Sequence, residues 1–71
     1  MKPIVECVEE HFGKRVVHMK VGNKMYAYML DFEWQWKRFW NYYKRGGSFK
    51  ALLVLKNHAR LIQKGGEYVK E

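Results

Sequence analysis

The feature that most constrains the fold is a pair of seven-residue segments whose side chains alternate between two faces, separated by Gly22-Asn23. Glycine accepts the positive φ angle that a two-residue hairpin turn requires, so residues 15–30 are expected to form a β-hairpin with Met19 opposite Tyr26. Because two strands alone are not stable in water, other elements must cover the hairpin or extend its sheet. One face of this hairpin would carry Val17, Met19, Val21, Tyr26, Tyr28 and Leu30.

Helical periodicity predicts one helix before the hairpin and another after it. Residues 3–12 place apolar side chains on one arc and three glutamates on the other, which is the pattern of an amphipathic helix. Residues 32–45 are expected to form a helix that begins at Asp31 as its N-cap and ends at Gly46. The expected core arc of this second helix consists of Phe32, Trp36, Phe39 and Tyr43, flanked by Trp40 and Tyr42.

Residues 49–64 allow two interpretations. Two short strands would flank a Lys-Asn-His turn, but neither face of those strands would be apolar. A single helix, capped by Ser48 and ended by Gly65, would gather most of the apolar side chains on one half, and this interpretation is favoured. Phe49 and Leu53 are the two apolar residues that do not fit that half.

The expected fold is therefore α+β. It is a small single domain spanning residues 1–71 in the order α-β-β-α-α, with one antiparallel hairpin that packs on helices or extends across a dimer. In the C-terminal tail, Tyr68 and Val69 are expected to dock on the domain or to pair as a sheet edge.

Composition excludes several classes of protein. With 71 residues there is room for one small core, and a single cysteine cannot form an internal disulfide. No segment has the roughly 20 consecutive apolar residues of a membrane span, and the N-terminus lacks the apolar region of a secretory signal. A cytoplasmic protein without membrane association is therefore expected.

The positive charge is concentrated in the centre of the chain. Residues 14–64 carry twelve Lys or Arg against Asp31 and Glu33, for a net charge of +10, whereas the two flanking segments are net acidic. Ten of the twelve aromatic residues lie in the same region, between Tyr26 and Phe49. Segregated positive charge favours an anionic partner, of which nucleic acid is the commonest, although surface lysines also occur on small domains without a partner.

One face of the helix expected over residues 32–45 combines an indole with basic and amide side chains. An indole between guanidinium and amide groups suits stacking on an unpaired base and clamping of phosphate. Packing of Trp34 under the tail or against a dimer mate is the alternative, because dense aromatic clusters more often form a core or an interface. The stripe, at positions i, i+4, i+7 and i+11, is Trp34, Arg38, Asn41 and Arg45, with Lys37 and Lys44 beside it.

The helix expected over residues 49–64 carries a second basic row. Its short Gly-containing connection to the preceding helix is also found in helix-turn-helix proteins, whose second helix enters the DNA major groove. In that case Asn57 and Arg60 would be candidate base-reading residues, since Asn suits adenine edges and Arg suits guanine edges. A plain helical hairpin has the same connection. The row is Lys56, Arg60 and Lys64, with Lys50 and Asn57 beside it.

No metal, cofactor or catalytic site is predicted. Cys7 and His11 are four residues apart, which suits two metal ligands on a helix, but both lie on the apolar arc and a structural zinc site needs four ligands. His18 and His58 are distant from this pair in the sequence. The carboxylates form no catalytic pair by their spacing, and a chain this short leaves little room for a substrate pocket, so an enzyme is not expected.

The sequence thus predicts a small, basic, non-catalytic protein that binds nucleic acid, either DNA or RNA, through phosphate contacts from its two later helices. The alternative is a structural or assembly module that forms a homodimer, or docks on a protein, through its aromatic surface. Exposure of the Trp34 indole beside Arg38 and Arg45 would favour the first hypothesis, and its burial in a symmetric contact would favour the second. The predicted contact residues are Trp34, Lys37, Arg38, Asn41, Lys44, Arg45, Lys50, Lys56, Asn57, Arg60 and Lys64.

Overall fold

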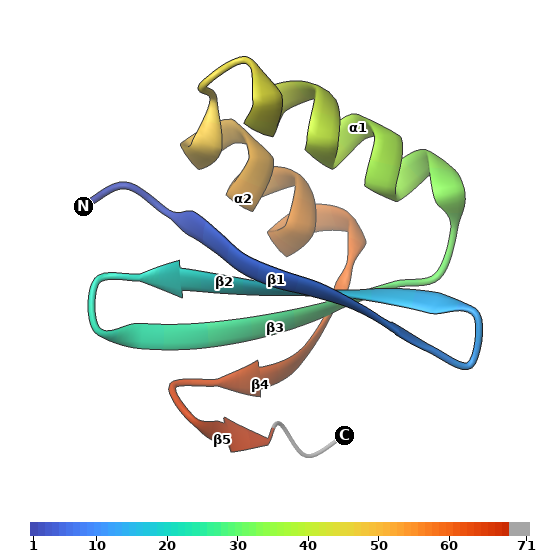
Figure 1. The fold of residues 1–71 in the computed structure, drawn as a ribbon, viewed down its shortest axis with the longest axis horizontal. Helices are drawn as coiled ribbons and strands as arrows, with labels where there is room; N and C mark the ends of the chain where they lie inside the picture. The colour runs from blue at the N-terminus through green and yellow to red at the C-terminus, as the bar shows by residue number, and fades with distance from the viewer. Residues whose placement is uncertain (69–71) are drawn as a thin grey trace.

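The computed structural model describes residues 1–68 and consists of one antiparallel sheet with two helices over one of its faces (Figure 1). The α+β class is confirmed, but the element order is β-β-β-α-α-β-β, and the strands are neighbours in the order of the sequence. The strands are β1 (Ile4–His11), β2 (Lys14–Val21), β3 (Lys24–Leu30), β4 (Arg60–Lys64) and β5 (Glu67–Tyr68), and the helices are α1 (Glu33–Lys44) and α2 (Ser48–His58).

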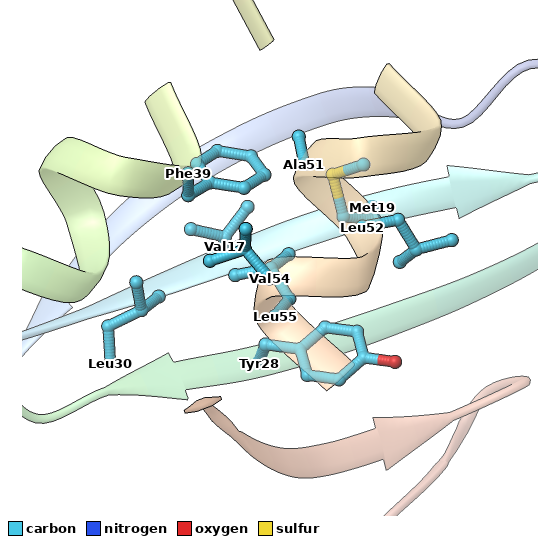
Figure 2. Close-up of a cluster of buried hydrophobic side chains, with 9 residues drawn as sticks. All are labelled: Val17, Met19, Tyr28, Leu30, Phe39, Ala51, Leu52, Val54 and Leu55. Atoms are coloured by element: carbon cyan, nitrogen blue, oxygen red, sulfur yellow. The ribbon is translucent and has the colours of Figure 1, made fainter. Parts of the chain in front are cut away.

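The predicted hairpin is confirmed as β2 and β3. Met19 pairs with Tyr26 and Val17 pairs with Tyr28, as the two-residue turn requires, and Gly22 adopts a φ of +64°. The face that carries these side chains is the one that the helices cover. Figure 2 shows the resulting core, made of Val17, Met19, Tyr28, Leu30, Phe39, Ala51, Leu52, Val54 and Leu55.

The helix predicted over residues 3–12 is wrong, because this segment is strand β1, paired with β2. The turn between the two strands is Phe12-Gly13, in which both residues have positive φ angles. Such turns normally carry Asn or Gly at their first position, so a phenylalanine there gives no turn signal. A β-bulge between Val5 and Cys7 also breaks the strict alternation by which a strand is recognised.

Helix α1 ends as predicted, but it begins differently. The amide of Gly46 donates to the Tyr43 carbonyl and the amide of Gly47 donates to the Tyr42 carbonyl, which is the Schellman arrangement, and Gly46 supplies its positive φ of +83°. The N-cap is Phe32 rather than Asp31, so that prediction is wrong.

The core arc expected for α1 is only partly confirmed. Phe39 is fully buried and Trp36 and Tyr43 pack against the core, but Phe32 is 63% exposed. Phe32 is the N-cap residue and has an extended backbone, so it does not belong to the helical arc. The flanking residues Trp40 and Tyr42 are also exposed.

The single helix expected over residues 49–64 is wrong in its second half. Helix α2 ends at His58, Ala59 is extended, and β4 pairs antiparallel with β3. A continued helix would leave the edge of β3 unpaired, whereas a strand satisfies its backbone groups. The N-cap of α2 is Gly47, not Ser48.

In the tail, Tyr68 pairs with Gln63 as part of β5, in line with the predicted sheet edge, and Val69 lies outside the described residues. Within residues 1–68, neither helix has the length and apolar character needed to cross a lipid bilayer.

Candidate nucleic-acid interface

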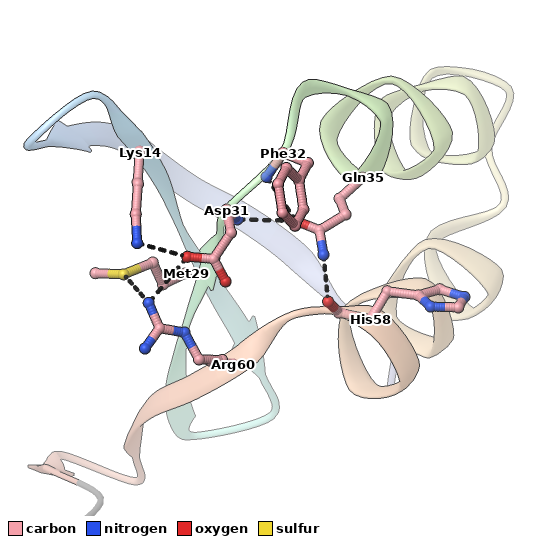
Figure 3. Close-up of polar contacts among 7 residues, drawn as sticks. All are labelled: Lys14, Met29, Asp31, Phe32, Gln35, His58 and Arg60. Carbon is pink, nitrogen blue, oxygen red and sulfur yellow. Dashed lines mark hydrogen bonds and ion pairs between the residues drawn. The ribbon is translucent and has the colours of Figure 1, made fainter.

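A buried glutamine holds the start of α1 against the end of α2 (Figure 3). The Gln35 Oε1 atom accepts hydrogen bonds from the backbone amides of Asp31 (2.8 Å) and Phe32 (3.0 Å), and its Nε2 atom donates to the His58 carbonyl at 2.6 Å. Sequence reasoning missed this residue. The available signal was its position, because a glutamine at the third residue of a helix often caps the first turn.

This link places Trp34 of α1 beside His58 of α2. Their ring centroids are 5.3 Å apart in an edge-on arrangement, and the guanidinium of Arg38 lies 6.0 Å from the indole centroid. The Trp34 side chain nevertheless remains 49% exposed. An indole held on one side and open on the other has a free surface on which a planar group can stack.

A groove of about 380 Å³ runs between the outer sides of the two helices. No carboxylate lines it, and its polar side chains are hydrogen-bond donors or amides. Arg38 from α1 faces Lys50 and Asn57 from α2 across this groove, three residues that the sequence placed on two separate stripes. The groove is lined by Arg38, Tyr42, Lys50, Leu53, Val54, Asn57 and His58.

The groove belongs to a wider surface that we call the basic helical face. All its members are exposed on the two helices or at the end of α1. The short connection through Gly46 and Gly47 turns the chain so that the two helices pack side by side. The basic helical face consists of Trp34, Lys37, Arg38, Asn41, Lys44, Arg45, Lys50 and Asn57.

The ion pairs of the nearby carboxylates are made with cations outside this face. Asp31 contacts the Lys14 Nζ atom at 2.8 Å and the Arg60 Nη2 atom at 2.9 Å, and the Lys14 hydrogen bond, helped by Arg60, holds the pKa of Asp31 below its usual value. Glu33 contacts Arg15 at 2.6 Å, and this hydrogen bond, helped by the charge of Lys37 on the basic helical face, lowers the pKa of the Glu33 carboxyl.

The cations of the basic helical face therefore keep most of their charge uncompensated. Among the residues that the structure describes, Arg38, Lys44, Arg45 and Lys50 form no ion pair. An uncompensated cluster of positive charges attracts a polyanion. The attraction extends over one Debye length, which is about 10 Å at 0.1 M salt.

The structure separates three predicted contact residues from this face. Arg60 lies on β4, where it contacts Asp31 and the Met29 sulfur at 3.2 Å, so its predicted place in a helical row beside Asn57 is wrong. Lys56 and Lys64 line a different pocket of about 360 Å³, between α2 and the sheet. The remaining lining of that pocket is Val21, Tyr26, Tyr28, Leu52 and Leu61.

Comparison with known proteins identifies no relative, since no family model matches this chain and neither a curated protein nor a solved structure matches it.

Proposed function

We propose that this protein binds nucleic acid through the basic helical face. The observation that carries the proposal is the groove between α1 and α2, in which Arg38, Lys50 and Asn57 converge with no carboxylate among the lining residues. Arg and Lys neutralise phosphates, and the resulting release of counterions supplies most of the affinity of non-specific binding.

The exposed indole supports contact with unpaired bases. Trp34 contacts His58 and Arg38, two of the residues that line the groove, so a backbone held in the groove would bring a base within reach of the ring. Stacking of a base on an aromatic side chain contributes about 1–3 kcal/mol and needs no particular sequence. Single strands should consequently bind more tightly than duplexes.

The test is a titration of single- and double-stranded DNA and RNA at several salt concentrations. Arg38→Gln should weaken binding to every sequence and reduce the slope of log affinity against log salt by about 1, because one phosphate contact is lost. Trp34→Ala should weaken single-strand binding about tenfold and duplex binding much less.

The matched control is Lys24→Gln, which removes one positive charge from the exposed first residue of β3, outside the basic helical face. This variant should change affinity far less than Arg38→Gln. If both variants weaken binding equally, only net charge matters and the groove is not the site. Absence of binding to any nucleic acid at low salt would refute the proposal altogether.

Self-association is a second candidate function. Phe49 and Leu53 are both exposed and lie four residues apart, so they form one apolar surface on α2 beside the groove. The exposed glutamates of β1 are suited to meet the basic helical face of a second copy. Light scattering over a range of concentrations should then show a dimer, whereas a monomeric mass at high concentration would exclude it.

A further inference from the structure

The sheet face opposite the helices carries a cluster of metal-ligating side chains. Cys7, Glu9 and His18 each offer one ligand atom, and these three atoms lie within 4.8 Å of one another. Cys7 and Glu9 are two residues apart on β1, and His18 on β2 is the direct partner of Cys7. Because side chains alternate along a strand, His18 points away from the face on which its neighbours Val17 and Met19 enter the core.

The β-bulge in β1 is what brings the cysteine to this face. Val5 pairs with Met19 and packs against the helix-covered core. In a regular strand Cys7, two residues later, would share that face. The register shift between Val5 and Cys7 instead sets Cys7 opposite His18, on the open side of the sheet. Bulges of this kind are frequent beside functional sites, where they re-aim a side chain.

The imidazole of His18 is incompletely satisfied within the described residues. Its Nε2 atom is shielded from solvent and has no hydrogen-bond partner. The Glu9 Oε2 atom lies 3.5 Å away, which is an ion-pair distance for a protonated imidazole but long for a hydrogen bond, and the Nε2 atom of His11 lies 3.3 Å from the same oxygen. A buried polar atom without a hydrogen bond calls for a specific explanation, and an ion is one of the common ones.

We propose that Cys7, Glu9 and His18 bind a zinc ion, with the fourth position open to solvent. Thiolate, imidazole and carboxylate are the three ligand types that zinc takes in proteins, whereas Mg²⁺ and Ca²⁺ prefer oxygen ligands alone. Zinc bonds of these types are about 2.0–2.3 Å long, so tetrahedral ligand atoms lie roughly 3.3–3.8 Å apart. In the structure the three ligand atoms lie within 4.8 Å of one another, and small rotations of the exposed Cys7 and Glu9 side chains bring them to the zinc-bound distance.

Zinc binding displaces the thiol proton of Cys7 to solvent, because the thiolate is the ligand. Since Cys7 and Glu9 lie on β1 and His18 lies on β2, the bound ion joins the edge strand to its neighbour. The site is separate from the basic helical face, which lies on the other side of the sheet. The test of Zn²⁺ binding is therefore independent of the test of nucleic-acid binding.

The test uses the full-length protein without an affinity tag, titrated with Zn²⁺ against a chromogenic chelator and with Co²⁺ as a spectroscopic probe. One ion per chain should bind, and the Co²⁺ form should show a thiolate-to-metal charge-transfer band. Cys7→Ser should abolish that band, and His18→Gln and Glu9→Gln should each weaken Zn²⁺ binding at least about tenfold, since even outer partners of a metal ligand cost that much.

The matched control is Glu10→Gln, which alters the neighbouring glutamate of β1 on the face opposite to Glu9. This variant should bind Zn²⁺ as the unmodified protein does. The proposal is overturned if Glu9→Gln and Glu10→Gln bind Zn²⁺ with the same affinity, or if Cys7→Ser leaves Zn²⁺ binding unchanged. It is also overturned if light scattering shows that Zn²⁺ makes a dimer with one ion for two chains. Circular dichroism without metal should show that every variant is folded.

Discussion

At the scale of single residues, the start of α1 is capped by Gln35 and not by Asp31. Asp31 precedes the helix, where an aspartate often caps, yet its carboxylate binds Lys14 and Arg60 from two different strands. Gln35 caps the helix instead, and its amide makes an additional hydrogen bond to α2. The ion pairs of Asp31 and the bond from Gln35 to α2 depend on residues far away in the sequence, so local preference could predict only the capping of the first turn by Gln35.

The ion pairs of Asp31 lead to a prediction for stability against pH. Because the pKa of Asp31 is lowered from its ordinary value of 3.8, the ion pairs stabilise the fold above about pH 4 and are lost as the pH falls through the lowered pKa. Asp31→Asn should therefore reduce the free energy of unfolding by about 1 kcal/mol at pH 7.

Urea unfolding of Asp31→Asn and the unmodified protein between pH 7 and pH 2 measures this difference, which should shrink towards zero at the acid end. Glu6→Gln is the control, because Glu6 is exposed and forms no ion pair with the described residues. A difference for Asp31→Asn that stays constant down to pH 2 would mean that its carboxylate charge does not stabilise the fold.

At the scale of elements, the ends of α1 and α2 show which signals are local. The turn after α1 was predictable, because a glycine in the left-handed region is required by the backbone itself. The end of α2 was not, since residues 60–64 have helical periodicity and become a strand only because β3 offers an unpaired edge. Strand β1 was missed for the related reason that its pairing, its turn and its bulge depend on β2.

The left-handed residue at the end of α1 gives a prediction for this element. Gly46→Ala should lower the free energy of unfolding by about 1–2 kcal/mol, because an alanine pays that cost at the φ of +83° that Gly46 adopts. Gly46→Asn should lose less, since asparagine tolerates this region. Urea denaturation measures both changes. Equal stability of the alanine variant would show that the turn is remade in another conformation.

At the scale of the whole molecule, the two helices cover one face of the sheet, which holds the main core, whereas neither helix covers the other face, on which Val16 and Ala27 are nevertheless buried. The helices cover the face that contains Tyr28 and Met19, and their outer sides form the basic helical face. This division places the proposed nucleic-acid site and the proposed zinc site on opposite sides of the sheet. It also explains why many of the aromatic residues are exposed, since a single small core cannot bury all of them.

The division predicts very different effects for two phenylalanines that the sequence placed on the same arc. Phe39→Ala should cost about 3–5 kcal/mol, because the ring is fully buried between α1 and the sheet. Phe32→Ala should change the free energy of unfolding by no more than about 0.5 kcal/mol, since the ring is largely exposed. Where Phe39→Ala fails to fold, Phe39→Leu provides a milder measurable loss. Similar losses at the two positions would contradict the observed packing.

The sequence by itself determined the central hairpin and its register, the α+β class, the extent of α1 to within a residue or two, and the concentration of positive charge. These features follow from alternation, helical periodicity and turn chemistry, which act over a few residues. It also supplied the Trp34 and Arg38 stripe, because residues four apart on a helix share a face.

The tertiary structure alone decided the rest. Residues 4–11 and 60–64 form strands, and Arg38 lines one groove with Lys50 and Asn57. Arg60 forms an ion pair with Asp31 instead of lying in a helical row, and Cys7 is paired with His18 across two strands. Each of these outcomes depends on backbone pairing or packing between segments that are separate in the chain. Such contacts are decided by the free energy of the whole fold, in which an unpaired sheet edge or a buried unpaired polar group outweighs local preference.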